Sequence, residues 1–330
     1  MSLPSLLRGK LSVPAVGAPL FISSGPDLVI AQCTSGIVGS FPALNARPAP
    51  LLSEWLDRIT SELAAYHKAD PSAPVAPFAV NQIVHRSNDR LEYDVQACID
   101  HRVPIVITSL GARPDINDAI HSYGGLVLHD VINDKFARKA IEKGADGLIA
   151  VAAGAGGHAG TLSPFALIRE IRTWFDGPLL LSGSIAHGQS ILAAQAAGAD
   201  LAYIGSAFLA TEEAVADKGY KEMIVGGTSA DVVYSNLFTG VHGNYLRGSI
   251  VAAGLDPDNL PESDPSAMDF GSGGNTEAKA WKDIWGSGQG IATVTATVPA
   301  AKLIQRLVEE YQQAVDALLT AVAAAPTAAP

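Results

Sequence analysis

Eight short, almost continuously apolar runs lie between residues 15 and 204, and a segment with helical spacing follows each of them. Continuous apolar runs are typical of strands that are buried on both faces of a parallel sheet. Eight such strand–helix units predict a closed (β/α)8 (TIM) barrel, and a doubly wound open sheet is the alternative. The predicted strands are 15–18, 37–41, 77–83, 104–109, 125–131, 146–152, 178–182 and 200–204.

The segments between these runs predict helices. The segment that begins at Asn133 has ordinary helix punctuation, because asparagine favours the N-cap position and Gly144 follows the last turn. The predicted helices are 51–67, 91–101, 133–143, 164–174 and 190–197.

The alternation stops after residue 216. Residues 218–240 have a helical and loop-like pattern, whereas residues 254–274 are rich in Asp, Pro, Gly and Ser and predict a long loop. Apolar residues at helical spacing from Leu303 to Val322 predict an amphipathic helix that packs against the barrel. The predicted domains are a barrel of residues 1–216 completed by helix 299–324, and a small, mainly helical second domain of residues 217–298.

The composition argues against several kinds of partner. Of the 330 residues 48% are hydrophobic, and the net charge of −11 disfavours nucleic acid or an anionic membrane as a partner. No apolar run approaches the ~20 residues that span a bilayer, and no secretory signal is visible, so we expect a cytoplasmic enzyme. Cys33 and Cys98 are expected to be buried thiols, and the scattered histidines predict no metal site.

A glycine-rich loop with one titratable side chain follows the sixth predicted strand. It reads Gly154-Ala-Gly-Gly-His-Ala-Gly160. Glycines let the backbone approach a ligand closely, and His158 is the only group in the loop that can exchange a proton near neutral pH. His158 is therefore a candidate catalytic residue, and the alternative is a loop histidine that hydrogen-bonds the backbone.

Two Gly-Ser pairs end the last two predicted strands. Gly183-Ser184 follows the seventh strand and Gly205-Ser206 follows the eighth. Loops at these positions of a β/α barrel often bind a phosphate through backbone amides and a helix N-terminus. The pairs predict a phosphate site, with two ordinary turns as the alternative; a positive φ is a further expectation at Gly205.

Other predicted strands also end in polar residues. Asn81 interrupts an apolar run, and a buried amide needs hydrogen-bond partners that the edge of a ligand's ring could supply. Thr108 and Ser109 end the fourth strand, and His129-Asp130 ends the fifth. We expect these residues to face the same end of the barrel as the glycine turns.

These segments, in this order, resemble the nitronate monooxygenase family, formerly called 2-nitropropane dioxygenases. The resemblance covers essentially the whole chain, and the histidine loop is its most specific part. A late segment, residues 284–290, resembles a family segment that closes over the flavin. The other matching segments are 18–20, 77–81, 156–160, 181–183, 205–206 and 208–211.

The resemblance implies an FMN-dependent barrel enzyme that oxidises alkyl nitronates with O2 to a carbonyl compound and nitrite. It implies that His158 is the catalytic residue beside the flavin, either as a neutral base or as a cation that stabilises an anionic substrate. It also implies a small-molecule substrate, and a homodimer is a further expectation. The implied cofactor-binding residues are Leu20, Asn81, Thr108, Gly156, Gly183, Ser184, Gly205 and Ser206.

Two positions depart from the family pattern. Val151 stands where some members have Gln or Asp, and Asp130 stands where some have Lys, so the polar contacts to the flavin and its potential are expected to differ. Two alternatives to the nitronate activity stay open: an NAD(P)H-dependent reductase of quinones or enoyl thioesters, and a non-redox barrel that binds a sugar phosphate.

Overall fold

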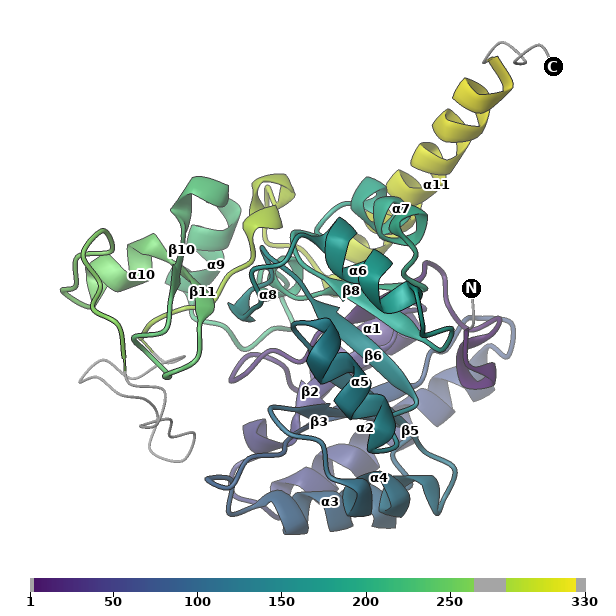
Figure 1. The fold of residues 1–330 in the computed structure, drawn as a ribbon. Coiled ribbons are helices and arrows are strands. Elements are labelled where there is room, and N and C mark those ends of the chain that lie inside the picture. The colour runs from purple at the N-terminus through teal and green to yellow at the C-terminus, as the bar shows by residue number, and fades with distance from the viewer. Residues whose placement is uncertain (1–2, 264–282, 325–330) are drawn as a thin grey trace.

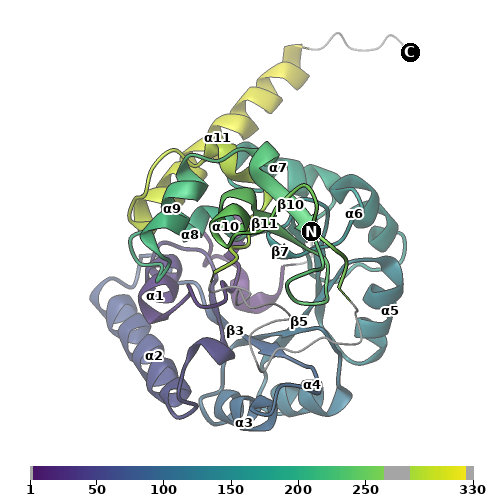
Figure 2. The same cartoon turned by 90° about the vertical axis from the view of Figure 1, so that its left-hand side faces the viewer.

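Eight parallel strands form a closed barrel with helices on its outside (Figures 1 and 2). The structure is a computed structural model that describes residues 3–263 and 283–324. A bridge between Val16 and Val38 joins the first two strands, which confirms the closed barrel over the open sheet. In their order around the barrel the strands are β1 (Ala15–Gly17), β9 (Leu201–Ile204), β8 (Leu179–Ser182), β6 (Gly147–Val151), β5 (Leu126–Val131), β4 (Ile105–Ser109), β3 (Phe78–Ile83) and β2 (Gly39–Pro42).

The principal helices lie in a ring around these strands (Figure 2). All five predicted helices are present, and α1 and α4 are additional. Both additional helices begin with proline, Pro26 and Pro114, which suits the first helical turn because its N–H groups have no partner within the helix. The ring consists of α1 (Pro26–Thr34), α2 (Leu51–Ala69), α3 (Leu91–Asp100), α4 (Pro114–His121), α5 (Asp134–Glu142), α6 (Pro164–Arg172) and α7 (Gly188–Ala197).

Apolar side chains fill the barrel and the layer between its strands and helices. Ile105, Ile149 and Leu201 are fully buried members of the inner cluster, and this explains why the strands are apolar on both faces. Cys33 and Cys98 are free and lie in the outer layer, as predicted, and burial raises the pKa of each thiol to about 12.

The segment after the barrel contains a small antiparallel sheet that the sequence did not predict. Its order is β10-β11-β7, and β7 is part of the histidine loop. The sheet lies over one end of the barrel (Figure 2). Of the predicted loop, residues 254–263 form neither helix nor strand, and residues 264–274 lie outside the described residues. The strands of this sheet are β7 (Gly157–His158), β10 (Val232–Ser235) and β11 (Gly243–Leu246). The helices between the barrel and this segment's end are α8 (Ser206–Leu209), α9 (Lys218–Val225) and α10 (Arg247–Ala252).

The last helix, α11 (Ala300–Ala324), packs on the barrel only with its first part. Glu310 accepts a hydrogen bond from the backbone N–H of Gly188 at the start of α7, at 2.9 Å. Beyond this contact the helix projects away from the barrel (Figures 1 and 2), and Leu318 and Val322 are exposed. The predicted packing is therefore confirmed for the first part and wrong for the second. In the described ranges no helix, α11 included, is long and apolar enough to cross a membrane.

Candidate active site

A large cavity lies at the end of the barrel that the small sheet covers. Its volume is about 1370 Å³, which exceeds the range of about 300–1,000 Å³ typical of sites for small ligands. The carboxyl ends of the barrel strands form its floor and the loops that follow them line its sides, where β/α barrels place their active sites. The cavity is therefore large enough for a cofactor together with a substrate.

The structure brings all but one of the predicted site residues to this cavity. The exception is Thr108, whose buried hydroxyl lies 2.6 Å from Nδ1 of His129 and 3.4 Å from the carbonyl oxygen of Leu128. Ser109 lines the cavity instead, because successive side chains of a strand point to opposite faces. The predicted residues that line the cavity are Leu20, Asn81, Gly156, His158, Gly183, Ser184, Gly205 and Ser206.

His158 reaches the cavity from the covering sheet and not from the barrel. Its strand pairs with β11, where His158 is opposite Gly243. Nε2 of His158 lies 2.9 Å from the hydroxyl oxygen of Thr239, and that hydroxyl donates to the carbonyl of Val241 at 3.1 Å. Nε2 of His158 thus has a hydrogen-bond partner in the covering segment, and this contact fixes the orientation of the ring.

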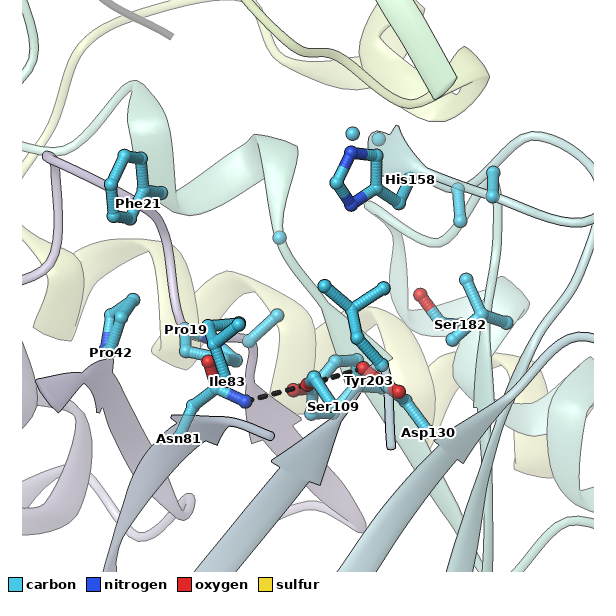
Figure 3. A pocket seen from close by; sticks show the side chains of 18 of the residues that line it. Pro19, Phe21, Pro42, Asn81, Ile83, Ser109, Asp130, His158, Ser182 and Tyr203 are labelled. Carbon is cyan, nitrogen blue, oxygen red and sulfur yellow. Dashed lines mark hydrogen bonds between the residues drawn. The ribbon is translucent and has the colours of Figure 1, made fainter. Parts of the chain in front are cut away.

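The surroundings of His158 favour its neutral imidazole. Burial lowers its pKa from the ordinary value to about 4, because the charged ring loses its hydration. Figure 3 shows the ring across the cavity from Asn81, Ser109 and Asp130. Of the two states that the sequence left open, this environment favours the neutral base over the cation.

The two predicted phosphate turns differ in their backbone geometry. Gly183 has φ +138°, which L side chains rarely adopt, and Ser184 next to it also has a positive φ, of 56°. Gly205 has φ −107°, so the expected positive φ is wrong there. A Cβ atom on Gly205 would lie at ordinary contact distance, 3.6 Å, from Leu20. Neither backbone conformation nor packing within the chain requires glycine at position 205, and its open side faces the cavity.

Residues 286–290 pack directly against the histidine loop. The backbone N–H of Gly288 donates to the Ser206 hydroxyl at 2.8 Å, and that of Gln289 donates to the Gly154 carbonyl at 2.9 Å. A Cβ atom on Gly156 would lie only 2.7 Å from the nitrogen of Gly288. Glycine at position 156 is thus required by this close packing, and the late segment closes one wall of the cavity.

The cavity carries more positive than negative side chains, although the chain as a whole has a net charge of −11. An excess of positive charge in a cleft attracts anions, and both a phosphate and a nitronate are anionic. The basic side chains that line the cavity are Arg47, Arg86, Arg113, Lys139 and Lys143, and the acidic ones are Glu92 and Asp130.

Two further residues of the site were not singled out from the sequence. Thr239, which fixes the His158 ring, lies in a loop without a motif, so no local signal marks it. Tyr203 lines the floor at the end of β9, and burial raises its pKa well above the usual value. Its position at the end of an apolar strand was the available signal.

The family model described as nitronate monooxygenase matches residues 62–310, which is most of the chain. The chain belongs to this family. A nitronate monooxygenase of Paraburkholderia phytofirmans is 26% identical over 92% of this chain and 94% of its own length. One from Pseudomonas aeruginosa is 29% identical over 65% of each chain. The resemblance seen in the sequence is thereby confirmed.

Solved structures of related fold support the same architecture. A nitroalkane oxidase from Streptomyces ansochromogenes superposes with a TM-score of 0.79 at 24% identity, covering 95% of this chain and 100% of its own. FabK from Thermotoga maritima superposes with a TM-score of 0.74 at 22% identity, covering 96% and 97%. The nitronate monooxygenase family consists of flavin-dependent oxidoreductases that oxidise nitronates or nitroalkanes, and this chain is such an enzyme.

Proposed function

We propose that this nitronate monooxygenase family member binds FMN and oxidises alkyl nitronates, and nitroalkanes, with O2 to a carbonyl compound and nitrite. The observation that carries the proposal is the neutral His158 ring, which faces a polar barrel floor across a cavity of about 1370 Å³. In this proposal the barrel, residues 1–216 with helix 299–324, holds FMN, and residues 217–298 cover the substrate.

The residues of the cavity fit a flavin mononucleotide. Both N–H groups of Asn81 are used within the chain, by the Ile107 carbonyl at 3.2 Å and the Ser109 hydroxyl at 2.7 Å. The amide oxygen is the group that remains, and it can accept from the N–H of the flavin ring. The open side of Gly205 and the turn at Gly183 offer a cradle for one phosphate.

Residues of the chain would remove a proton from the substrate and attract the anion that results. The His158 ring would take the α-proton of a neutral nitroalkane, and the contact of its Nε2 with the Thr239 hydroxyl keeps the ring oriented. The basic side chains that line the cavity would attract the resulting anion. When bound, FMN supplies the two-electron oxidation and the reaction with O2.

The purified protein should release FMN and not FAD. The glycine turns at Gly183 and Gly205 offer a place for one phosphate, and the sequence has no adenine-binding fingerprint. Heat release followed by chromatography against both standards identifies the cofactor. Release of FAD, or of no flavin, would contradict the proposal.

The pH dependence of nitroalkane oxidation should follow the lowered pKa of His158. The unprotonated ring is required, so kcat/KM for a neutral nitroalkane should stay level above about pH 4 and fall as the pH drops through that value. A pH profile recorded where flavin remains bound measures this. A fall in kcat/KM centred near the ordinary imidazole pKa of about 6.5 would contradict the lowering of the His158 pKa by burial.

An NAD(P)H-dependent reductase is the second candidate. A relative from Rhodococcus jostii, 23% identical over 72% of this chain, is named as a dehydrogenase of a carboxyl-CoA compound. The basic side chains that line the cavity would suit the phosphates of such substrates as well. O2 uptake with a small nitronate tests the first activity, and rapid flavin bleaching on anaerobic mixing with NADH would support the second.

A further inference from the structure

Three polar side chains on the barrel floor form a single line of hydrogen bonds (Figure 3). They stand on the adjacent strands β3, β4 and β5. Nδ2 of Asn81 donates to the Ser109 hydroxyl at 2.7 Å, and that hydroxyl donates to Oδ2 of Asp130 at 2.6 Å. All three residues line the cavity, so a change in the charge of Asp130 acts on the floor that a ligand would contact.

The backbone carbonyl of Ile107 decides which group donates in each of these hydrogen bonds. Nδ2 of Asn81 also lies 3.2 Å from the carbonyl oxygen of Ile107, and a carbonyl can only accept. The amide nitrogen must therefore face inward and donate to Ser109. Since the Ser109 hydroxyl has one proton, it gives that proton to Oδ2 of Asp130. A proton that binds Asp130 must then sit on Oδ1.

The surroundings of Asp130 favour the protonated carboxyl. Burial raises its pKa, and the opposing influences of His129, the Ser109 hydroxyl and the Leu110 N–H are smaller. Burial also lowers the pKa of His129; Asp130 opposes this shift, and Lys143 acts in the same direction as burial. Tyr203 faces the carboxylate and keeps its proton. In residues 3–263 and 283–324 no lysine or arginine forms an ion pair with Asp130.

Granted the FMN site proposed above, we propose that Asp130 binds a proton on Oδ1 when the cofactor is reduced and releases it on reoxidation, so that this carboxyl links the flavin's reduction potential to pH. The electrons come from the substrate and the proton comes from solvent in the cavity; Asp130 itself makes and breaks no other bond. Asp130 is thus a positioning residue, which acts on the reaction through the charge beside the cofactor.

The link between potential and pH follows from reciprocity. Negative charge added to the cavity disfavours a neighbouring carboxylate and so strengthens proton binding by Asp130. By the same coupling, a protonated Asp130 makes reduction more favourable, and a carboxylate makes it less favourable.

The test compares the midpoint potential of the bound flavin across a series of pH values in the wild type and in Asp130→Asn. Asparagine keeps an oxygen that can accept from Ser109 but holds no charge. We expect the two potentials to agree at acidic pH and the variant's to become progressively higher as the pH rises. Asp118→Asn is the matched control, because Asp118 is an exposed carboxylate that does not line the cavity, and the potential of this variant should follow the wild type.

A second variant keeps the proposal testable if Asp130→Asn loses flavin. Ser109→Ala removes a hydrogen bond that stabilises the carboxylate, so the pH at which the potential changes slope should move upward. Flavin content is measured first by release, so that a wild type without flavin refutes the proposed function itself. Potentials of a flavin-loaded Asp130→Asn that match the wild type at every pH, or an unmoved slope change in Ser109→Ala, would overturn the role of Asp130.

Discussion

His158→Asn is expected to lower kcat/KM for a neutral nitroalkane by about 10²–10⁴-fold, the usual contribution of general-base catalysis. Asparagine has no basic nitrogen, so the α-proton has no acceptor at the place that Thr239 and β11 fix for the ring. A preformed nitronate has already lost this proton and should lose much less activity. The measurement compares kcat/KM for the neutral and anionic forms of one nitroalkane.

The matched control for this variant is His242→Asn. His242 lies in the same covering segment, stacks on Tyr234 with ring centroids 5.1 Å apart and does not line the cavity. It should keep wild-type activity on both substrate forms, and both variants should retain flavin. If His158→Asn loses the two activities equally while flavin stays bound, His158 is not the base, and if it loses neither, the histidine is structural.

Gly205→Val should largely abolish flavin retention and leave the barrel folded. Its φ of −107° suits any L residue, and the nearest atoms to an added Cβ are Leu20 and Ala18, at 3.6 and 3.7 Å. The branched side chain would therefore fill cavity space where the proposed phosphate and ring need the backbone. Absorbance of the purified variant gives its flavin content, and circular dichroism checks the fold.

Gly25→Val is the control for this substitution. Gly25 has an extended backbone with φ −136°, which suits any L residue. The nearest atom to an added Cβ is 4.0 Å away on Trp55, and Gly25 does not line the cavity. This variant should retain flavin. Full flavin occupancy in Gly205→Val would place the phosphate elsewhere and would count against the proposed cofactor site.

The barrel could be predicted because its strands are buried on both faces and therefore stand out as apolar runs. Asn81 could be found for the same reason, since the amide pair Asn81-Gln82 is conspicuous in such a run. Thr108 does not line the cavity whereas Ser109 does, and this depends on which face of β4 meets the cavity, of which the neighbouring residues give no sign.

The covering sheet could not be predicted from local patterns. Its strands β10 and β11 have four residues each, and β7 has two. The pairing of His158 with Gly243 joins distant parts of the chain, so neither segment alone indicates a strand. The contact of Thr239 with His158 depends on that same long-range pairing and was therefore invisible in the sequence.

His158 and the barrel floor belong to different sheets, and this has an evolutionary consequence. The ring belongs to a strand paired with β11, whereas Asn81, Ser109 and Asp130 belong to β3, β4 and β5. Insertions, deletions or repacking in the covering sheet would therefore change the spacing between His158 and the floor while the barrel core stays intact. One scaffold can in this way acquire new substrates by modest changes in a peripheral sheet, without redesign of its cofactor platform.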